Sequence, residues 1–152
     1  MARKIAVFNL KGGVAKTTTV NSLAAGLVEL KNKVLVIDMD PQSSLTYLLT
    51  EKGTRLKGTT EDILFQKKSV DECIMQASMY DYIGSTLRLT MVEMELNGKY
   101  NKEFILKKAL VKSGIEKNYD YIIFDCPPGL GIFSLNALSA SNEIIIPCQC
   151  EL

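Results

Sequence analysis

A short glycine-containing segment, residues 11–19, follows the apolar run at residues 5–8 and precedes a long stretch of helical apolar spacing. A strand that ends in a glycine-rich turn and leads into a helix exposes backbone N–H groups at the positive end of the helix dipole. Such a turn binds anions, above all phosphate. Gly12 and Gly13 remove two side chains from the turn, so the backbone can take a positive φ and approach a phosphate oxygen closely. The segment therefore predicts a phosphate-binding loop between a strand and a helix.

A lysine and a threonine at the end of this loop add to its chemistry. Lys16 supplies a mobile positive charge, and Thr17 supplies a hydroxyl group suited to a magnesium ion. The usual P-loop pattern, G-x-x-x-x-G-K-[ST], matches only at its Lys-Thr end, because Leu10 and Ala15 stand where the pattern has glycine. An ordinary Gly-Gly turn with solvated lysines is the alternative, and the strand-to-helix context argues against it.

The segment K-G-G-V-A-K-T-T resembles the deviant Walker A box of the ParA/MinD group of ATPases, in which a second lysine stands at the front of the loop. The resemblance implies that Lys11 reaches the nucleotide of a partner subunit, so that two chains enclose two ATP molecules. It further implies a set of nucleotide-binding residues that comprises Lys11, Gly12, Gly13, Val14, Ala15, Lys16, Thr17 and Thr18.

A pair of aspartates ends the next predicted strand. Helical spacing over residues 20–28 is followed by an unbroken apolar run at residues 34–37, typical of a strand buried on both faces of a parallel sheet. Asp38 and Asp40 follow this run, and carboxylates at the carboxyl end of a parallel strand face the phosphate site. Asp40, which precedes Pro41, also suits the N-cap of a short helix, and the two interpretations are compatible. The D-x-D-P-Q segment resembles the switch region of the same group, which implies that Asp40 orients the attacking water and that Asp38 lies near the magnesium.

A second buried run, residues 121–124, ends in Asp125. An aspartate in this place can hold magnesium through water and would complete a metal site with Thr17 and the phosphates. The alternative is that Asp125 caps the next turn. A helical pattern over residues 132–138 and an apolar run at residues 143–147 then repeat the strand-helix-strand order.

The stretch between residues 50 and 117 is much less informative. It predicts a helix start at residues 59–62, helical faces near residues 89–96 and 105–110, and a weak strand near residues 82–83. The lysines opposite the 105–110 face are interpreted as solvated, with contact to DNA or a partner as the alternative. Four methionines are interpreted as core-filling residues: Met75, Met79, Met91 and Met94.

The composition narrows the classes of function. With 152 residues, of which 47% are hydrophobic and 23% charged, the chain can form one domain, 1–152, with a substantial core. A net charge of +1 gives no global attraction to nucleic acid or acidic membranes. The absence of histidine and of any C-x-x-C pair argues against a zinc site and favours buried, reduced thiols for the four cysteines. No apolar run near the start is long enough for a signal peptide or a membrane span, so we expect a cytoplasmic protein without a membrane partner.

These patterns predict an α/β fold with a doubly wound, mostly parallel sheet and helices on both faces, as in P-loop nucleotide-binding domains. The segment FDCPPGLGIFSLNAL, followed by IIIPCQCE, resembles the ParA/Soj partition branch in particular. This resemblance implies a switch that binds ATP and Mg²⁺, hydrolyses ATP weakly unless a partner stimulates it, and forms an ATP-dependent homodimer. The implied catalytic residues are Lys11, Lys16 and Asp40, and the implied magnesium residues are Thr17, Asp38 and Asp125.

The resemblance also implies partners, namely non-specific nucleoid DNA and an adaptor protein of the ParB type. Members of this family usually continue beyond the strand at residues 144–146, so we expect that the C-terminal part with the DNA-binding region is missing and that this apolar strand stays uncovered. Truncation, a split gene and self-association are all compatible with such a strand. Two other functions stay open: an ATP-dependent small-molecule ligase of the dethiobiotin-synthetase type, against which Lys11 argues, and a non-catalytic ATP-binding fragment.

Overall fold

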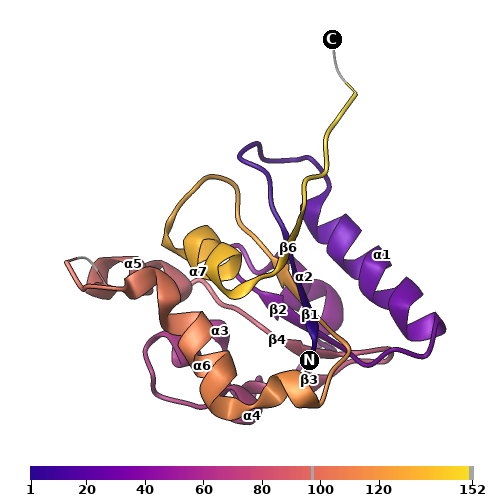
Figure 1. Cartoon of the computed structure of the whole chain (residues 1–152), viewed down its shortest axis with the longest axis horizontal. Helices are drawn as coiled ribbons and strands as arrows, with labels where there is room; N and C mark the ends of the chain where they lie inside the picture. Colours follow the sequence, from indigo (N-terminus) through magenta and orange to yellow (C-terminus); the bar gives the residue numbers. More distant parts are fainter. Residues whose placement is uncertain (97, 151–152) are drawn as a thin grey trace.

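The computed structural model describes residues 1–96 and 98–150, and its centre is one six-stranded sheet (Figure 1). The strand order is β3-β4-β2-β5-β1-β6, and every neighbouring pair is parallel except β3 with β4. The strands are β1 (Arg3–Val7), β2 (Val34–Asp38), β3 (Met75–Gln76), β4 (Asp81–Ile83), β5 (Tyr121–Asp125) and β6 (Glu143–Ile145). The predicted mostly parallel sheet is therefore confirmed.

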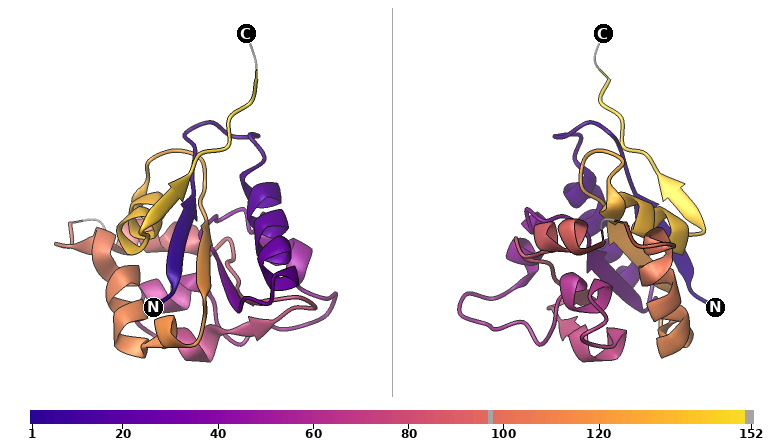
Figure 2. Two further views of the ribbon diagram at one scale, coloured as in Figure 1. Left: turned by 45° about the vertical axis from the view of Figure 1, so that its right-hand side comes forward. Right: turned by 90° about the vertical axis from the view of Figure 1, so that its left-hand side faces the viewer.

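Helices cover both faces of this sheet (Figure 2). One face carries α1 (Lys16–Glu29) and α2 (Ser44–Leu49), and the other carries most of the remaining helices. Those on the second face are α3 (Thr60–Leu64), α4 (Val70–Cys73), α5 (Leu89–Leu96), α6 (Ile105–Ser113) and α7 (Ile132–Ala140), with 3₁₀ turns at Lys102–Phe104 and Ile115–Lys117. The expected doubly wound arrangement is confirmed.

The strands reach both cores because successive side chains point to opposite faces. In β2, Leu35 and Ile37 pack on the α6 and α7 side, whereas Val34 and Val36 pack on the α1 side. All five residues of β2 are buried, which explains why its sequence is an unbroken apolar run rather than an alternating one.

The parallel strands give the sheet two chemically distinct ends. We call the end where these strands finish the carboxyl edge, and the end where they begin the amino edge. Val7 and Asp38 both pair in register with Asp125 at the carboxyl edge, which lies toward the top of Figure 1. The ends of three separate chain segments are thereby placed side by side.

Two expectations are wrong, one for the burial of the methionines and one for the length of the last strand. Met91 and Met94 are 55% and 81% exposed, because α5 turns Leu89, Val92 and Leu96 toward the core at helical spacing and leaves the methionines on the outer side. Met79 is also exposed, and only Met75 is buried as expected. The last strand is shorter than predicted, since β6 ends at Ile145, and Glu151, the last letter of the IIIPCQCE segment, lies outside the described residues.

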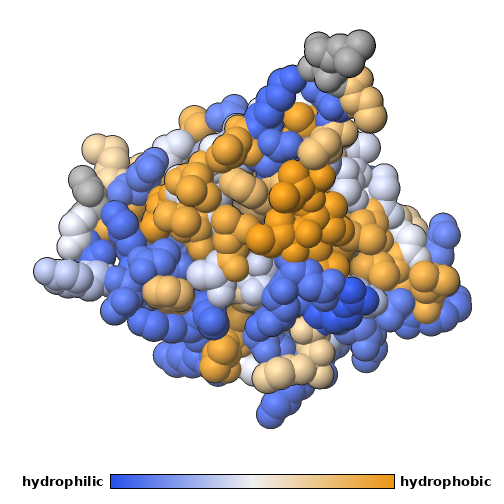
Figure 3. Space-filling model, turned by 45° about the horizontal axis from the view of Figure 1, so that its top comes forward, coloured by the Kyte–Doolittle hydropathy of each residue, from blue (hydrophilic) through white to orange (hydrophobic). Residues whose placement is uncertain are grey.

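Exposed apolar side chains lie on β6, on α7 and in the segments beside them. Figure 3 shows an apolar area at the centre of this face of the molecule. The exposed residues concerned are Leu130, Leu135, Ile144 and Ile146. The expectation of an uncovered strand at residues 144–146 holds for Ile144, which is 52% exposed. Among the helices of the described chain, none combines the length and the apolar character that a membrane crossing requires.

Candidate functional site

The loop between β1 and α1 lies at the carboxyl edge and has the backbone shape of an anion cradle. Gly13 has φ +74° and Ala15 has φ +62°, so two left-handed residues turn the chain into the start of α1. The first helical bond of α1 runs from the Thr19 N–H to the Ala15 carbonyl oxygen, at 2.9 Å. The preceding N–H groups at the helix start have no intrahelical acceptor and suit a phosphate group. Open space surrounds the Cβ positions of Gly12 and Gly13, which leaves room for such a ligand.

Lys16 is a largely buried cation without a carboxylate partner. Its side chain is folded over the loop, where Nζ donates a hydrogen bond to the Lys11 carbonyl oxygen at 3.1 Å, and the residue is only 8% exposed. Neither of the ion pairs found in the described chain involves Lys16. Burying an ammonium group without a counter-charge is costly, so this position is suited to a bound anion.

Asp125 supplies a buried carboxylate directly beside this loop. Its Oδ2 accepts a hydrogen bond from the Thr17 hydroxyl at 2.8 Å, whereas its Oδ1 is buried and has no hydrogen-bond partner in the described residues. Burial raises the pKa of Asp125 to about 7, the Thr17 bond opposes this rise, and the negative charge of Asp38 adds to it. A buried carboxylate oxygen without a donor is a natural ligand for a cation. The alternative that Asp125 caps the next turn has no hydrogen bond to support it within the described chain.

Asp38 lies in register with Asp125 but uses its carboxylate to hold its own loop. Oδ1 accepts the Asp40 N–H at 3.0 Å, and Oδ2 accepts both the N–H and the hydroxyl of Thr46, at 2.9 and 2.6 Å. Burial raises the pKa of Asp38. The described residues contain no group of three or more acidic or cysteine side chains placed to hold a metal. The predicted position of Asp38 near a magnesium ion stays a prediction, and direct coordination would displace one of these hydrogen bonds.

Asp40 is half-buried and closes a turn rather than capping a helix. Its Oδ1 accepts the Gln42 N–H at 2.8 Å, and its carbonyl oxygen accepts the Ser85 hydroxyl at 2.6 Å. The expectation that Asp40 is the N-cap of the short helix is wrong, because α2 begins at Ser44 and its N-cap is Ser43. The turn at Pro41 and Gln42 intervenes, and Ser43 itself has φ +56°. The predicted role of Asp40 toward water stays a prediction.

Three hydroxyl groups that hold this loop were not predicted. The Thr60 hydroxyl donates to the Asp38 carbonyl oxygen at 2.6 Å, and the Ser85 N–H donates to the Thr46 hydroxyl at 2.8 Å. Together with the Asp38–Thr46 and Ser85–Asp40 bonds, these contacts join α2, α3 and the end of β4 to the segment after β2. Only Ser85 had a sequence signal, because it follows a predicted strand and therefore had to lie at the carboxyl edge.

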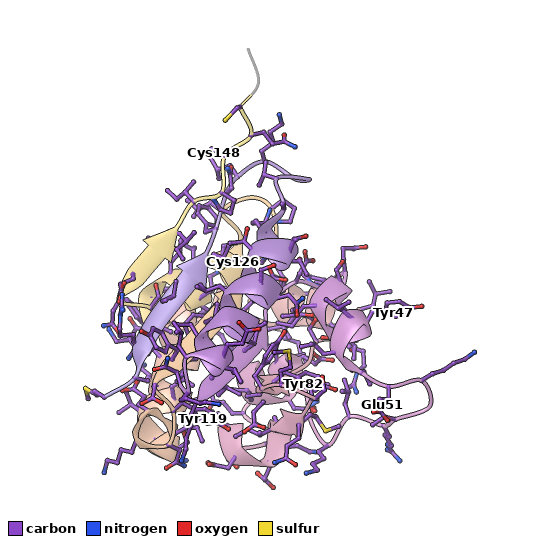
Figure 4. The ribbon with its side chains drawn as sticks, turned by 90° about the vertical axis from the view of Figure 1, so that its right-hand side faces the viewer. Tyr47, Glu51, Tyr82, Tyr119, Cys126 and Cys148 are labelled. Atoms are coloured by element: carbon purple, nitrogen blue, oxygen red, sulfur yellow. The ribbon has the colours of Figure 1, made fainter. Side chains whose placement is uncertain are left out.

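The segment after β6 runs beside the loop between β1 and α1, which we call the nucleotide-loop candidate. Gln149 Nε2 donates to the Gly13 carbonyl oxygen at 3.1 Å, and Asn9 Nδ2 donates to the Pro147 carbonyl oxygen at 2.7 Å. Cys148 and Cys150 are exposed, so the expectation of buried thiols is wrong for these two and right for Cys73 and Cys126. Figure 4 shows Cys148 on this segment at the carboxyl edge.

The site as a whole combines features of both signs at one place. The N–H groups at the start of α1, which have no intrahelical acceptor, and the buried Lys16 suit an anion. The Thr17 hydroxyl and the Asp125 Oδ1, which has no partner among the described residues, suit a cation beside it. A phosphate chain that carries a divalent metal ion satisfies both requirements, and the residues present fit such a group.

Comparison with known proteins adds relatives that match nearly the whole chain. A family model described as an AAA domain matches residues 2–152. The chain is 40% identical to the sporulation initiation inhibitor protein Soj of Bacillus subtilis (strain 168) over an alignment of 153 positions, which covers 99% of this chain and 60% of Soj. It is likewise 40% identical to the chromosome partitioning protein ParA of Myxococcus xanthus (strain DK1622), over 99% of this chain and 53% of ParA. The chain thus spans little more than half the length of these curated relatives.

A solved structure with a similar fold extends over the complete chain. It is the cobyrinic acid a,c-diamide synthase from Mycobacterium smegmatis, crystallised with an ATP analog and magnesium. The TM-score is 0.93 and the identity 36%, and the match covers 100% of this chain and 62% of the synthase. The chain thus corresponds to somewhat less than two thirds of the length of that synthase.

Proposed function

The chain belongs to the AAA-domain family, and we propose that it is a ParA-type partition ATPase that binds and hydrolyses Mg-ATP as a molecular switch. The observation that carries the proposal is the combination of two buried groups at the carboxyl edge. Lys16, at the start of α1, forms no ion pair among the described residues, and the Asp125 Oδ1, at the end of β5, has no donor there. The ATP analog and magnesium in the similar synthase structure support the choice of ligand.

The loop residues would bind and orient the phosphates. The N–H groups of residues 12–18 and the Nζ of Lys16 would surround the phosphate oxygens, and Lys16 would give up its bond to the Lys11 carbonyl. Thr17 and Asp125 would hold the magnesium ion, which supplies charge neutralisation at the phosphates when bound. Asp125 would lose its proton to solvent, because a cation beside the carboxylate favours the ionised form.

Asp40 would position the water for hydrolysis. The water oxygen attacks the terminal phosphorus, the bond from that phosphorus to the bridging oxygen breaks, and the products are ADP and inorganic phosphate. The Asp40 carboxylate would accept a hydrogen bond from this water. Its backbone carbonyl oxygen is already held by Ser85 and its carboxylate by the Gln42 N–H, which would reduce the entropy lost on orienting it.

The proposed biological role follows the family. ATP would join two copies of the chain, Lys11 of each copy would stabilise the nucleotide charge of the other, and an adaptor of the ParB type would accelerate turnover. Nucleoid DNA would be the surface on which the switch acts in the cytoplasm. These partners are proposals for this chain, because it matches only 53 to 60% of the length of the two partition relatives.

The test is the molar mass of the chain by light scattering with ADP, with Mg-ATP, and with Mg-ATP in the Asp40→Ala variant. We expect a dimer with Mg-ATP only, and a longer-lived dimer in the variant, which would bind ATP without hydrolysing it. Lys16→Ala should weaken nucleotide binding by roughly 10- to 100-fold, whereas Lys11→Ala should keep binding and lose the dimer. Equal loss of nucleotide affinity in both lysine variants would exclude the cross-subunit role. Nucleotide binding without hydrolysis at any DNA or adaptor concentration would instead indicate a non-catalytic module.

One observation favours a second candidate function, an ATP-dependent small-molecule ligase. The similar structure with a TM-score of 0.93 is that of a metabolic synthase. A ligase would form a ligated or phosphorylated small product in step with ATP consumption, whereas a partition switch would release phosphate alone and respond to DNA and adaptor. Product analysis by mass spectrometry distinguishes the two candidates.

A further inference from the structure

A second cavity lies outside the nucleotide loop and is lined mainly by polar side chains. It has a volume of about 590 Å³, within the range of roughly 300 to 1,000 Å³ that is usual for small-molecule sites. The loop before α3 forms one wall, and it projects from the body of the molecule (Figure 2, right; Glu51 marks it in Figure 4). We call this the cationic cavity, and its lining residues are Arg55, Leu56, Lys57, Gly58, Thr59, Glu61, Asp62, Lys68, Thr86 and Arg88.

The two carboxylates of the cationic cavity are already satisfied by neighbouring donors. Glu61 is fully buried and accepts hydrogen bonds from the N–H and the hydroxyl of Thr86. Asp62 Oδ2 accepts the N–H and the hydroxyl of Thr59, at 3.1 and 3.0 Å, in the capping box of α3. Both carboxylates therefore serve the local fold rather than the lining cations.

The four lining cations, by contrast, form no ion pair among the described residues, although the charge of Lys68 adds to the hydrogen bonds from Ser69 that lower the pKa of Glu72. The ion pairs of the described chain involve none of Arg55, Lys57, Lys68 and Arg88, and all four residues are exposed. Lys68 Nζ donates to the Lys57 backbone carbonyl oxygen, which fixes the Lys68 ammonium against the loop before α3. Like charges that converge on one concave surface repel each other and favour a bound anion. The two guanidinium groups can each bind a phosphate group through two parallel hydrogen bonds.

We propose that the cationic cavity binds a small anion that carries two or more phosphate groups, at a site separate from the nucleotide loop. The number of cations matches a multiply charged ligand, and the volume matches a small molecule. No residue of the cationic cavity belongs to the loop at residues 11–18, so the two sites can be filled at once.

The cationic cavity is also connected to the Asp38–Asp40 segment. Thr86, which binds Glu61 in the cavity wall, is adjacent to Ser85, whose hydroxyl donates to the Asp40 carbonyl oxygen. A ligand that shifts the turn at Ser85 and Thr86 would therefore change the position of Asp40. This consequence rests on the proposed function, whereas binding in the cavity does not.

The test is calorimetric titration of the full chain with inorganic pyrophosphate. The Lys16→Ala variant weakens the nucleotide loop as a competing site, and we expect one pyrophosphate site to persist in it. Adding Arg55→Gln and Arg88→Gln should then lower the affinity by roughly tenfold or more. The matched control is Lys107→Gln with Lys108→Gln, which removes two exposed cations from α6 and should leave the affinity unchanged.

A second measurement avoids dependence on the Lys16 variant. In the unmodified chain, pyrophosphate should shift the amide NMR signals of Gly58 and Thr86, as well as those of the nucleotide loop. Absence of these shifts, or equal affinity in the cavity variant and the α6 control, would overturn the proposal. Binding of a short DNA duplex, but not of pyrophosphate, at the same residues would overturn the assignment to a small molecule. Failure of the proposed function would leave these results unaffected, because ATP hydrolysis is not measured.

Discussion

The two edges of the sheet differ in how far their buried charged side chains are paired. At the amino edge, charged and polar side chains are matched. Lys4 Nζ lies 2.6 Å from Glu116 Oε1, and the two side chains are only 11% and 7% exposed. The Tyr119 hydroxyl donates to Asp81 at 2.6 Å, and Figure 4 shows Tyr119 at the end of the molecule opposite Cys148.

At the carboxyl edge, two buried charges lack such matches within the described chain, whereas the buried Asp38 accepts three hydrogen bonds. Lys16 is 8% exposed and has no carboxylate partner, and the Oδ1 of Asp125 has no donor. The backbone there is also less relaxed, because Ala15 and Ser43 both have a positive φ. The comparison indicates that buried charges are paired at the amino edge, where they contribute only to stability. Lys16 and Asp125 are left without such pairs at the carboxyl edge, where a ligand is expected.

The largest predicted effect tests the amino edge. Lys4→Met should destabilise the protein by about 3 to 5 kcal/mol, because it leaves the Glu116 carboxylate buried without its partner. Urea unfolding at pH 7 measures the change. The control is the double variant Lys4→Met with Glu116→Leu, which should recover most of the loss, since an apolar pair of similar size avoids the unpaired charge. Equal destabilisation in both variants would show that packing, rather than charge, matters at this edge.

The next prediction concerns Asp125, whose replacement should increase the stability of the ligand-free protein rather than decrease it. The folded pKa of about 7 is above the ordinary value of 3.8, so ionisation of this carboxyl opposes folding. The protonated carboxyl group therefore contributes its full stability below about pH 4, and this contribution is lost as the pH rises through 7 and the group ionises in the folded protein. Asp125→Asn should therefore stabilise the ligand-free protein by roughly 2 to 4 kcal/mol at pH 8 and have little effect at pH 4.

Thermal unfolding across this pH range measures the effect of Asp125→Asn. Glu93→Gln, which makes the same chemical change on the exposed side of α5, is the control and should leave stability nearly unchanged at both pH values. Loss of stability at pH 8 in Asp125→Asn would mean that this carboxylate is satisfied in the free protein and that the contrast between the edges is wrong.

A smaller effect tests the strain of the loop itself. Gly13→Ala should cost about 1 to 2 kcal/mol, because alanine is disfavoured at φ +74°. Gly12→Ala is the matched control, since an added methyl group would meet open space at both positions and only Gly13 has a positive φ. Chemical denaturation distinguishes the two. The same cost at both positions would point to steric contact instead of backbone conformation.

The smallest effect is expected for the exposed pair at the amino edge. Arg3 donates to Glu143 at 2.7 and 2.8 Å, but the two side chains are 58% and 41% exposed, so solvent screens their attraction. Arg3→Gln should shift the melting temperature much less than Lys4→Met, and this shift should diminish at high salt. A shift as large as that of Lys4→Met would mean that matched charge stabilises this edge regardless of burial.

The nucleotide-loop candidate and the parallel sheet could be predicted because their signals are contiguous. Residues 11–19 carry the loop, and β1, β2 and β5 fall on unbroken apolar runs at residues 5–8, 34–37 and 121–124. One further rule, that parallel strands end at the same edge, placed Asp38 and Asp125 together, and the structure has them in register. Local spacing plus this topological rule was sufficient for these residues.

The contacts that joined distant segments could not be predicted in the same way. Thr46 and Ser85 are 39 residues apart, and the Lys4–Glu116 pair spans 112. The exposure of Met91 depends on which side of α5 faces the sheet, and a short helix with apolar residues on both sides does not specify that side. The cationic cavity likewise combines residues from separate segments, none of which resembles a site alone.

The amino-acid sequence by itself thus determined the loop that we propose to bind phosphate, the sheet and the edge at which its carboxylates would lie. These depend on hydrogen-bond geometry and periodicity over a few residues, which neighbouring side chains specify. Only the tertiary structure decided which charges are matched, because pairing and burial depend on distances between segments far apart in the chain. This pairing distinguishes the amino edge, where the buried charges are paired, from the carboxyl edge, where Lys16 and Asp125 are left available for a ligand.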